Sequence, residues 1–334
     1  MSRHKLVPYD LQIREKNQTT DYVDLLQLLT TNTYQQEYGG NVSSAPQTFI
    51  ERFATFCEYW RSNNGAYIDQ DFQKTLRVSQ DDEEFAVDES NNIVEAVFKY
   101  GDYGQTIDSY DTSTGDADTN RLTPDESAEI PLYFLLHIPE ETPEEAIVLM
   151  EESNNQGMKL RFQGALQDRL LDGLSNEISV RKSDDVYQAI RNADRVKRFE
   201  VETSESPDEL GGEFSSVFSP STTGKQITYK PTQDGEIRMD VNELESWVEG
   251  QNNPFRNVDG ETYTEFKVTI ERAGSQTTIN FFDKGVDQTR ILDDVEMEGG
   301  HPVPSYMGQE ARQFVNQELL PNGANNIPTD SLLR

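Results

Sequence analysis

Cysteine and histidine are scarce in this chain of 334 residues, and their scarcity limits the chemistry that it can carry. Cys57 is the only cysteine, so no disulfide can form within the chain, and we expect it to pack as a small apolar residue. The three histidines, His4, His137 and His301, stand far apart in the sequence. His137 lies inside an apolar run, which favours a core residue over a ligand. We therefore expect no metal and no cofactor.

Long apolar runs are also missing. No segment approaches the roughly 18 uninterrupted apolar residues that a membrane-spanning helix needs. The first residues, Met1 to Leu6, lack the apolar run of a signal peptide. These absences predict a cytoplasmic protein without membrane contact.

Positive charge is scarce as well. The chain has 61 acidic residues against 29 Lys and Arg, and its net charge is −32. In dilute buffer such self-repulsion works against the compact state, whereas the Debye length at 1 M salt is only about 3 Å. An acidic, disordered partner of basic proteins is the alternative, but an aromatic content of 10% and many short apolar runs argue against wholesale disorder. The acidic, lysine-poor composition resembles that of haloarchaeal proteins, and we expect bound K⁺ or Na⁺ on the surface.

Apolar periodicity predicts both strands and helices in the first part of the chain. Apolar residues alternate within 66–78 and 92–100, which is typical of strands in a half-buried sheet. The spacing of Tyr22 and the following leucines predicts a helix over 21–29, with Asp21 as its N-cap. The acidic, glycine-rich and threonine-rich stretch 101–120 predicts a mobile, solvated loop.

The strongest core signal is the apolar run 130–138, which predicts a central strand paired with 146–150. From Met158 to Leu174 the apolar residues line one side of a predicted helix. A second helix is predicted over 183–195, with Ser183 as its N-cap.

The C-terminal part predicts a hairpin and a last helix. Residues 264–270 and 277–282 alternate around a short turn at 273–275, the clearest hairpin pattern in the chain. A helix is expected over 305–319.

Together these patterns predict an α+β fold with a mixed or antiparallel sheet, packed helices and a smaller β-rich C-terminal portion. We expect a core domain over 1–202 with an acidic loop at 101–129, and a linker or mobile loop over 203–224. Residues 225–334 would form the hairpin-containing portion that ends in a helix.

Charge distribution carries the main functional prediction. Residues 159–198 hold nine basic and six acidic residues, a net charge of +3 in a strongly anionic chain. On the predicted helix Arg191, Arg195 and Arg198 would share one face, which indicates contact with a phosphate backbone. Internal pairing with nearby carboxylates, such as Asp194 with Arg198, is the alternative. The candidate nucleic-acid-binding residues are Lys159, Arg161, Arg181, Lys182, Arg191, Arg195, Lys197 and Arg198.

A second pattern points to nuclease chemistry. Asp259, Glu265 and Lys267 match the Asp…Glu-x-Lys arrangement in which carboxylates hold Mg²⁺ and a lysine positions water. Charged residues that alternate on the outer face of a hairpin produce the same spacing by chance. We identify no catalytic residue and no phosphate-binding glycine loop from the sequence.

The core pattern also supports a family resemblance. The apolar strand 130–138 is followed by Pro139, a second apolar strand at 146–150, a polar break at 155–156, and then Gly157, Met158 and Lys159 leading into a helix. This succession resembles the RexA-type phage-exclusion proteins. The resemblance implies sequence-nonspecific binding of DNA by a dimer with a mobile domain, in host defence, with Lys159 and the arginines of the basic window as the contacts.

The leading hypothesis is thus a non-enzymatic protein of a halophilic archaeon or its virus that binds double-stranded DNA, acts in phage exclusion and forms a homodimer. The first alternative is a non-enzymatic interaction or self-assembly protein whose acidic surface serves solvation in salt. The second alternative is a metal-dependent nuclease.

Overall fold

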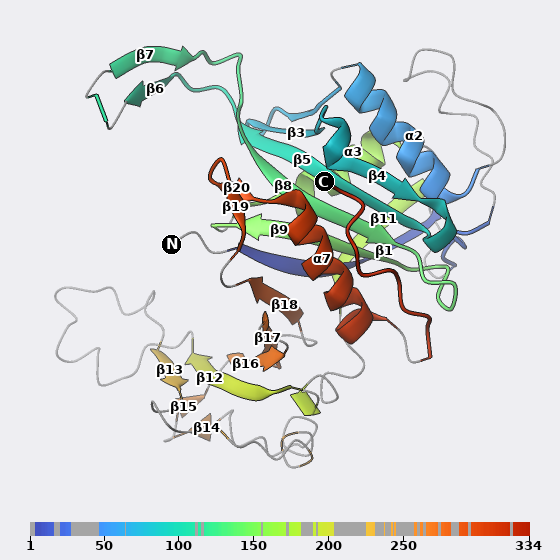
Figure 1. Cartoon of the computed structure of the whole chain (residues 1–334), viewed down its shortest axis with the longest axis vertical. Helices are drawn as coiled ribbons and strands as arrows, with labels where there is room; N and C mark the ends of the chain where they lie inside the picture. Colours follow the sequence, from blue (N-terminus) through green and yellow to red (C-terminus); the bar gives the residue numbers. More distant parts are fainter. Residues whose placement is uncertain are drawn as a thin grey trace. The chain divides into compact units, whose positions relative to one another are not determined.

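The computed structural model divides the chain into two compact units, residues 1–179 with 294–334, and residues 180–293. Both units are drawn in Figure 1, where the colours follow the sequence. The structure describes residues 4–16, 21–27, 47–63, 65–110, 113–114, 117–154, 156–171, 174–181, 190–191, 193–203, 225–230, 237, 242, 244, 257–258, 261–262, 265–272, 275–281, 287–292, 295–320 and 323–334.

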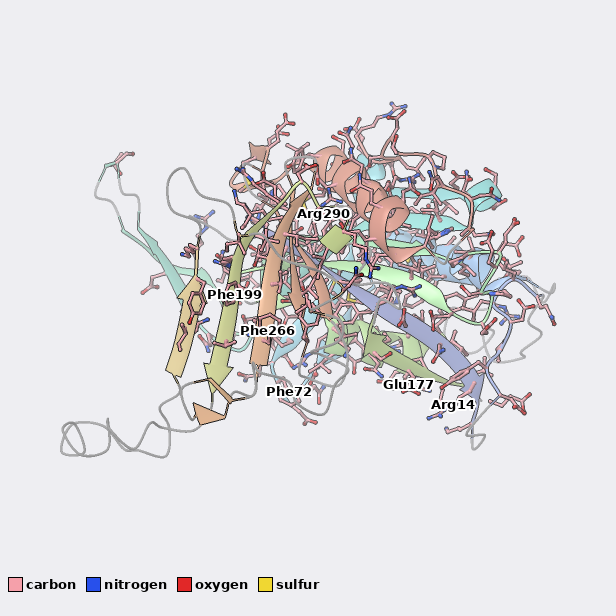
Figure 2. All side chains as sticks on the ribbon, turned by 90° about the horizontal axis from the view of Figure 1, so that it is seen from below. Arg14, Phe72, Glu177, Phe199, Phe266 and Arg290 are labelled. Carbon is pink, nitrogen blue, oxygen red and sulfur yellow. The ribbon has the colours of Figure 1, made fainter. Side chains whose placement is uncertain are left out.

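The first unit is built on an antiparallel sheet. Its strands follow one another across the sheet in the order β11, β1, β9, β8, β5, β3 and β2, with β4 paired to β5 and β10 paired to β9. Figure 2 shows Arg14 of β1 near Glu177 of β11, with 4.0 Å between Nη1 and Oε2. The strands of this unit are β1 (His4–Glu15), β2 (Tyr67–Asp69), β3 (Lys74–Val78), β4 (Phe85–Asp88), β5 (Ile93–Asp102), β6 (Ile107–Tyr110), β7 (Ala117–Leu122), β8 (Ala128–His137), β9 (Ala146–Ser153), β10 (Gln156–Gly157), β11 (Leu174–Val180), β19 (Met297–Glu298) and β20 (His301–Pro302).

The centre of this sheet confirms the predicted core. In β8, residues Leu132 to Leu136 are at most 2% exposed, and Phe134 pairs with Met150 of β9. The two strands are antiparallel, as is every pairing in the described chain for which the register is defined, for example that of β5 with β8. A strand that is apolar on both faces needs cover on both faces, so helices are expected on either side of the sheet.

One face carries α2 (Phe49–Ser62) and α3 (Lys159–Arg169). Helix α2 begins at Phe49 because Thr48 and Glu51 form a capping box. The Phe53 ring lies 5.7 Å from that of Phe134 in β8 and 5.9 Å from that of Phe162 in α3. Cys57 is fully buried in α2, as predicted, and burial raises the pKa of its thiol well above the usual value.

The opposite face carries α7 (Pro304–Phe314), which continues into the short π-helix η5 (Val315–Leu319). Glu95 of β5 is next to Ala96, and Ala96 pairs with Phe134, so Glu95 and Phe134 lie on opposite faces of the sheet. Arg312 of α7 donates from Nε to Glu95 Oε1 at 2.6 Å. The terminal helix predicted over 305–319 is therefore confirmed, and Figure 1 shows α7 lying across the strands of this unit.

In the second unit five strands follow one another in the order β13, β12, β16, β17 and β18, and each of these neighbours pairs antiparallel. Phe266, Val268 and Ile270 of β16 are at most 1% exposed and form the centre of its apolar core. The predicted hairpin is confirmed, because β16 pairs with β17 from Arg272–Ser275 to Lys267–Asn280. The strands of this unit are β12 (Arg195–Thr203), β13 (Lys225–Tyr229), β14 (Asn257–Val258), β15 (Glu261–Thr262), β16 (Glu265–Arg272), β17 (Ser275–Asn280) and β18 (Asp287–Leu292).

Two predictions in the N-terminal part were wrong. Residues 21–27 form no helix: Tyr22 bridges to Arg14, and the Asp24 carboxylate accepts the backbone N–H groups of Leu26 and Gln27 in a turn. An aspartate that bonds to its neighbouring backbone competes with helix formation, although the predicted apolar residue Leu25 is fully buried. The predicted loop 101–120 contains two strands instead, because β6 and β7 pair as a hairpin from Ile107–Leu122 to Tyr110–Ala117.

The boundaries of the two compact units differ from the predicted domain boundaries. The division falls at residue 180, before β12, while α7 and the C-terminal residues group with the first unit. The buried Glu95–Arg312 pair is one contact that joins them to it. Of the predicted linker 203–224, Thr203 ends β12 and residues 204–224 lie outside the described part of the chain.

Candidate functional site

The basic residues of the window 159–198 are divided between the two units. Lys159 and Arg161 belong to the first unit, whereas Arg181 and the later basic residues belong to the second. Lys182 and most of the helix predicted over 183–195 lie outside the described residues, and Ile190 and Arg191 are helical.

The shared helix face of Arg191, Arg195 and Arg198 was a wrong prediction. Arg195 begins β12 and Arg198 lies on the same strand, beyond a bulge between Val196 and Arg198. The reason is tertiary: pairing of β12 with β16 buries Val196 and Val201 against the apolar core of the second unit, which local helix periodicity cannot reveal.

In the first unit both basic candidates already have aromatic or acidic neighbours. Lys159 Nζ lies 5.2 Å from the centre of the Tyr9 ring. Arg161 is 9% exposed; its Nε lies 3.0 Å from Asp69 Oδ2, and its guanidinium group lies 4.5 Å from the centre of the Phe72 ring. Arg161 therefore holds the β2–β3 turn and offers little free surface to a phosphate.

In the second unit one carboxylate binds two of the candidates. Glu271 of β16 accepts from Arg195 at Oε1, with 2.6 Å to Nη2, and lies 2.7 Å from Lys197 Nζ at Oε2. The hydrogen bond from Lys197, followed by that from Arg195, lowers the pKa of Glu271 below its usual value. The carboxylate is therefore ionised at neutral pH and cancels part of the basic charge of β12.

The remaining candidates in the described part of the chain also have partners. Arg198 Nε donates to Thr269 Oγ1 at 3.2 Å and lies 3.6 Å from Glu200 Oε2. Arg191 Nη2 donates to Asn242 Oδ1 at 3.1 Å, and Arg181 is buried. Internal pairing, the alternative weighed from the sequence, thus accounts for Arg161, Arg195, Lys197 and Arg198. Arg195 still leaves 57% of its side chain exposed.

The structure describes two of the three residues of the nuclease pattern. Glu265 and Lys267 lie two residues apart on β16 and so share a face of that strand, whereas Asp259 lies outside the described residues. Lys267 Nζ is 3.7 Å from Glu202 Oε2 on the neighbouring strand β12. Among the described residues, no group of three or more His, Cys, Asp or Glu side chains is arranged to hold a metal ion.

His137 is a core residue, as predicted, and one of its ring nitrogens is hydrogen-bonded. It is 5% exposed, and its Nδ1 lies 3.1 Å from the carbonyl oxygen of Asn91, so Nδ1 carries the proton. Burial lowers the pKa of His137 from the usual 6.5 to about 4. His4 is likewise buried, with its Nδ1 2.8 Å from Glu151 Oε1, and neither Nε2 atom finds a partner among the described residues.

Two features were not predicted from the sequence: the carboxylates that bind the basic residues, and the β6–β7 hairpin. Glu271 lies 76 residues after Arg195, and no local spacing connects them. The hairpin had a local signal: Ile107, Tyr110 and Leu122 stand on either side of the Ser-Thr-Gly sequence at 113–115.

No protein-family model matches the chain, and no curated protein matches it in sequence. The resemblance to the RexA-type proteins therefore stays a prediction from the pattern of the core strands and the helix that follows them. Of the helices in the described part of the chain, none is long and apolar enough to cross a bilayer.

Proposed function

We propose that the chain is a non-enzymatic interaction protein and that the β6–β7 hairpin is its contact arm. The supporting observation is the position of the hairpin. It forms a two-stranded sheet of its own, and Figure 1 shows it extending away from the main sheet of the first unit. Because a lone two-stranded hairpin is only marginally stable in water, we infer that contact with a partner completes its packing.

Charge indicates the kind of partner. Residues 103–127, which include the hairpin, contain six acidic residues and one basic residue, Arg121. Complementary charge favours the right partner and excludes the wrong one. Since the Debye length is about 3 Å at 1 M salt, this preference acts only at direct contact. The partner we propose is therefore a protein with a basic surface, which displaces K⁺ or Na⁺ from the arm on binding.

The test measures binding of a fluorescent oligo-arginine peptide by anisotropy, in KCl from about 0.2 M to about 2 M. The arm variant is Asp108→Asn/Asp111→Asn/Asp116→Asn/Asp118→Asn. The control, Glu140→Gln/Glu141→Gln/Glu298→Gln/Asp330→Asn, removes the same charge from exposed positions outside the arm.

We expect the arm variant to bind roughly tenfold more weakly in molar KCl and the control to bind as the wild type does. Equal weakening in both variants would show that overall charge, not the hairpin, attracts the peptide. No binding by the wild type in molar KCl would remove the proposal.

A second candidate function is binding of double-stranded DNA by the second unit, in the host-defence setting that the RexA-type resemblance implies. The observation that favours it is the 57% exposure of the Arg195 side chain, which leaves donors available beyond its ion pair with Glu271. Arg191, in the same unit, bonds to Asn242 at an exposed position. Molar salt removes most of the counterion-release advantage, so such binding would depend on hydrogen bonds and shape.

The test is a gel shift with duplex DNA in molar KCl. We expect Arg191→Glu/Arg195→Glu to weaken binding by about tenfold or more, because two phosphate contacts become repulsive. The control, Lys230→Glu/Arg334→Glu, reverses two exposed charges elsewhere and should bind as the wild type does. Equal binding by all three proteins, or none, would exclude DNA contact through these arginines.

A further inference from the structure

Exposed apolar side chains gather at one edge of the first unit. Five large apolar side chains of the described chain are exposed, and three of them belong to the β2–β3 hairpin and the first turn of α3. Ile68 is 55% exposed, and Phe72 and Leu160 are each 66% exposed. We call these three residues the β2-edge patch; Phe72 is labelled in Figure 2.

Phe72, on the face of the hairpin that carries α3, is held in a fixed position. Arg161, next to Leu160, places its guanidinium group over the Phe72 ring and pairs with Asp69. The Asp69 carboxylate also accepts the backbone N–H of Phe72 at 3.2 Å. Phe72 and the first turn of α3 are thus tied together, so a partner that covers Phe72 restricts its motion little further.

The strand beside the patch is an edge strand. Among the described residues β2 pairs only with β3 and is the last strand in the order of the sheet. The side chains of Tyr67 and Asp69 lie toward Gly164 and Arg161 of α3, so the alternation of the strand places Ile68 on the other face. An edge strand with exposed apolar side chains is a template for pairing with another strand.

Charge identifies a second copy of the chain as the partner. A net charge of −32 keeps copies apart over most of the surface. Around the patch, however, residues 65–76 and 158–162 contain two acidic and three basic residues, and the only further acidic residues that contact them among the ion pairs and hydrogen bonds described are Asp102, at Lys74, and Asp168, at Tyr67. Asp69 pairs with Arg161, and Lys74 pairs with Asp102, so the local charges are largely compensated. Two copies can meet here with less like-charge repulsion than elsewhere on the surface.

We propose that two copies of the chain associate through this edge, with β2 of one copy antiparallel to β2 of the other. The centre of the three-residue strand, Ile68, then lies beside Ile68 of the partner copy. Phe72 and Leu160 are covered on the face that carries α3. Molar salt screens the remaining repulsion and leaves the apolar contact intact, so the dimer is favoured under the conditions for which the composition is suited. The three patch residues lie outside the β6–β7 hairpin, although Tyr103 at the base of that hairpin donates to the backbone oxygens of Asp69 and Gln73 in the β2–β3 hairpin.

Sedimentation velocity of the full chain in about 2 M KCl, over a hundredfold range of concentration, tests the proposal. We expect a dimer for the wild type and a monomer for Phe72→Ser/Leu160→Ser. The control, Tyr229→Ser/Met297→Ser, removes exposed apolar side chains outside the patch, of 45% and 44% exposure, and should remain dimeric. Near-ultraviolet circular dichroism checks that each variant is folded.

A cross-link gives a second, independent measurement. Cys57 is buried, so Ile68→Cys places one accessible thiol on β2, and oxidation should link two copies through a disulfide. Met297→Cys is the matched control and should stay uncrosslinked at the same concentration. A monomeric wild type, a dimer that Phe72→Ser/Leu160→Ser leaves intact, or an Ile68→Cys chain that stays uncrosslinked would overturn the proposal. Either result leaves the peptide-binding test of the arm unaffected.

Discussion

Glu95 and Arg312 form a fully buried ion pair in the first unit, although 217 positions separate them in the sequence. Glu95 Oε1 accepts from Arg312 Nε at 2.6 Å and from the Tyr133 hydroxyl at 3.1 Å. Its Oε2 accepts the backbone N–H of Leu332 at 2.7 Å. This carboxylate therefore links β5, β8, α7 and the C-terminal segment.

Loss of one member of this pair is expected to destabilise the chain strongly. Arg312→Met leaves the Glu95 carboxylate buried without its cationic partner, which costs roughly 3–5 kcal/mol in comparable pairs. Urea unfolding in molar KCl measures the change in the free energy of unfolding. The double variant Glu95→Gln/Arg312→Met should lose less than the sum of the single variants. A cost below about 1 kcal/mol for Arg312→Met would contradict this account.

His137 is expected to make the fold sensitive to mild acid. Its pKa is lowered from 6.5 to about 4 in the folded chain, mainly by burial, so the unfolded chain takes up the proton first as the pH falls. Stability is therefore retained above pH 6.5 and is lost progressively toward pH 4, by about 2 kcal/mol between pH 7 and pH 4.5. Unfolding curves of the wild type and of His137→Gln measure this difference. Identical pH slopes for the two proteins would show that His137 does not titrate as described.

Glu271 is expected to restrain the basic strand β12. Glu271→Gln releases Arg195 and Lys197 from their shared carboxylate and removes one negative charge beside them. If the second unit binds DNA, the affinity in molar KCl should rise by roughly threefold to tenfold. The matched control, Glu202→Gln, removes the carboxylate beside Lys267 and should have a smaller effect. A gel shift that shows weaker binding by Glu271→Gln would count against phosphate contact at Arg195.

Salt is expected to stabilise the fold. Because the net charge is −32, raising KCl from about 0.1 M to about 2 M should raise the melting temperature by screening repulsion between carboxylates. Choline chloride at the same ionic strength separates general screening from specific binding of K⁺. A melting temperature that falls with KCl would contradict the interpretation of the composition.

Much of the sheet could be predicted from the sequence. The strands β5, β8, β9, β16 and β17 were found because alternating or continuous apolar residues are a local signal of burial. The helix at 21–29 failed because Asp24 bonds to its own turn, and that competition is invisible in apolar periodicity. The helix face of Arg191, Arg195 and Arg198 failed because strand pairing with β16 decides the conformation of β12.

The candidate site was less predictable than the fold. A basic window can be counted in the sequence, but the partners of its side chains come from other strands. Glu271 reaches Arg195 and Lys197 only because β12 and β16 pair in one register, which brings Arg195 opposite Glu271. The β2-edge patch could not be predicted from the sequence either, since Phe72 and Leu160 are 88 positions apart and carry no periodic signal of their own.

The sequence by itself determined the sum of the charges, the lack of an internal disulfide and the apolar strands of the core, because each depends on composition or on neighbours within a few residues. Only the tertiary structure decided which charges are paired, as Glu95 with Arg312, and which apolar side chains stay exposed, as Phe72 and Leu160. The physical reason is that pairing and burial depend on the register between elements distant in the chain.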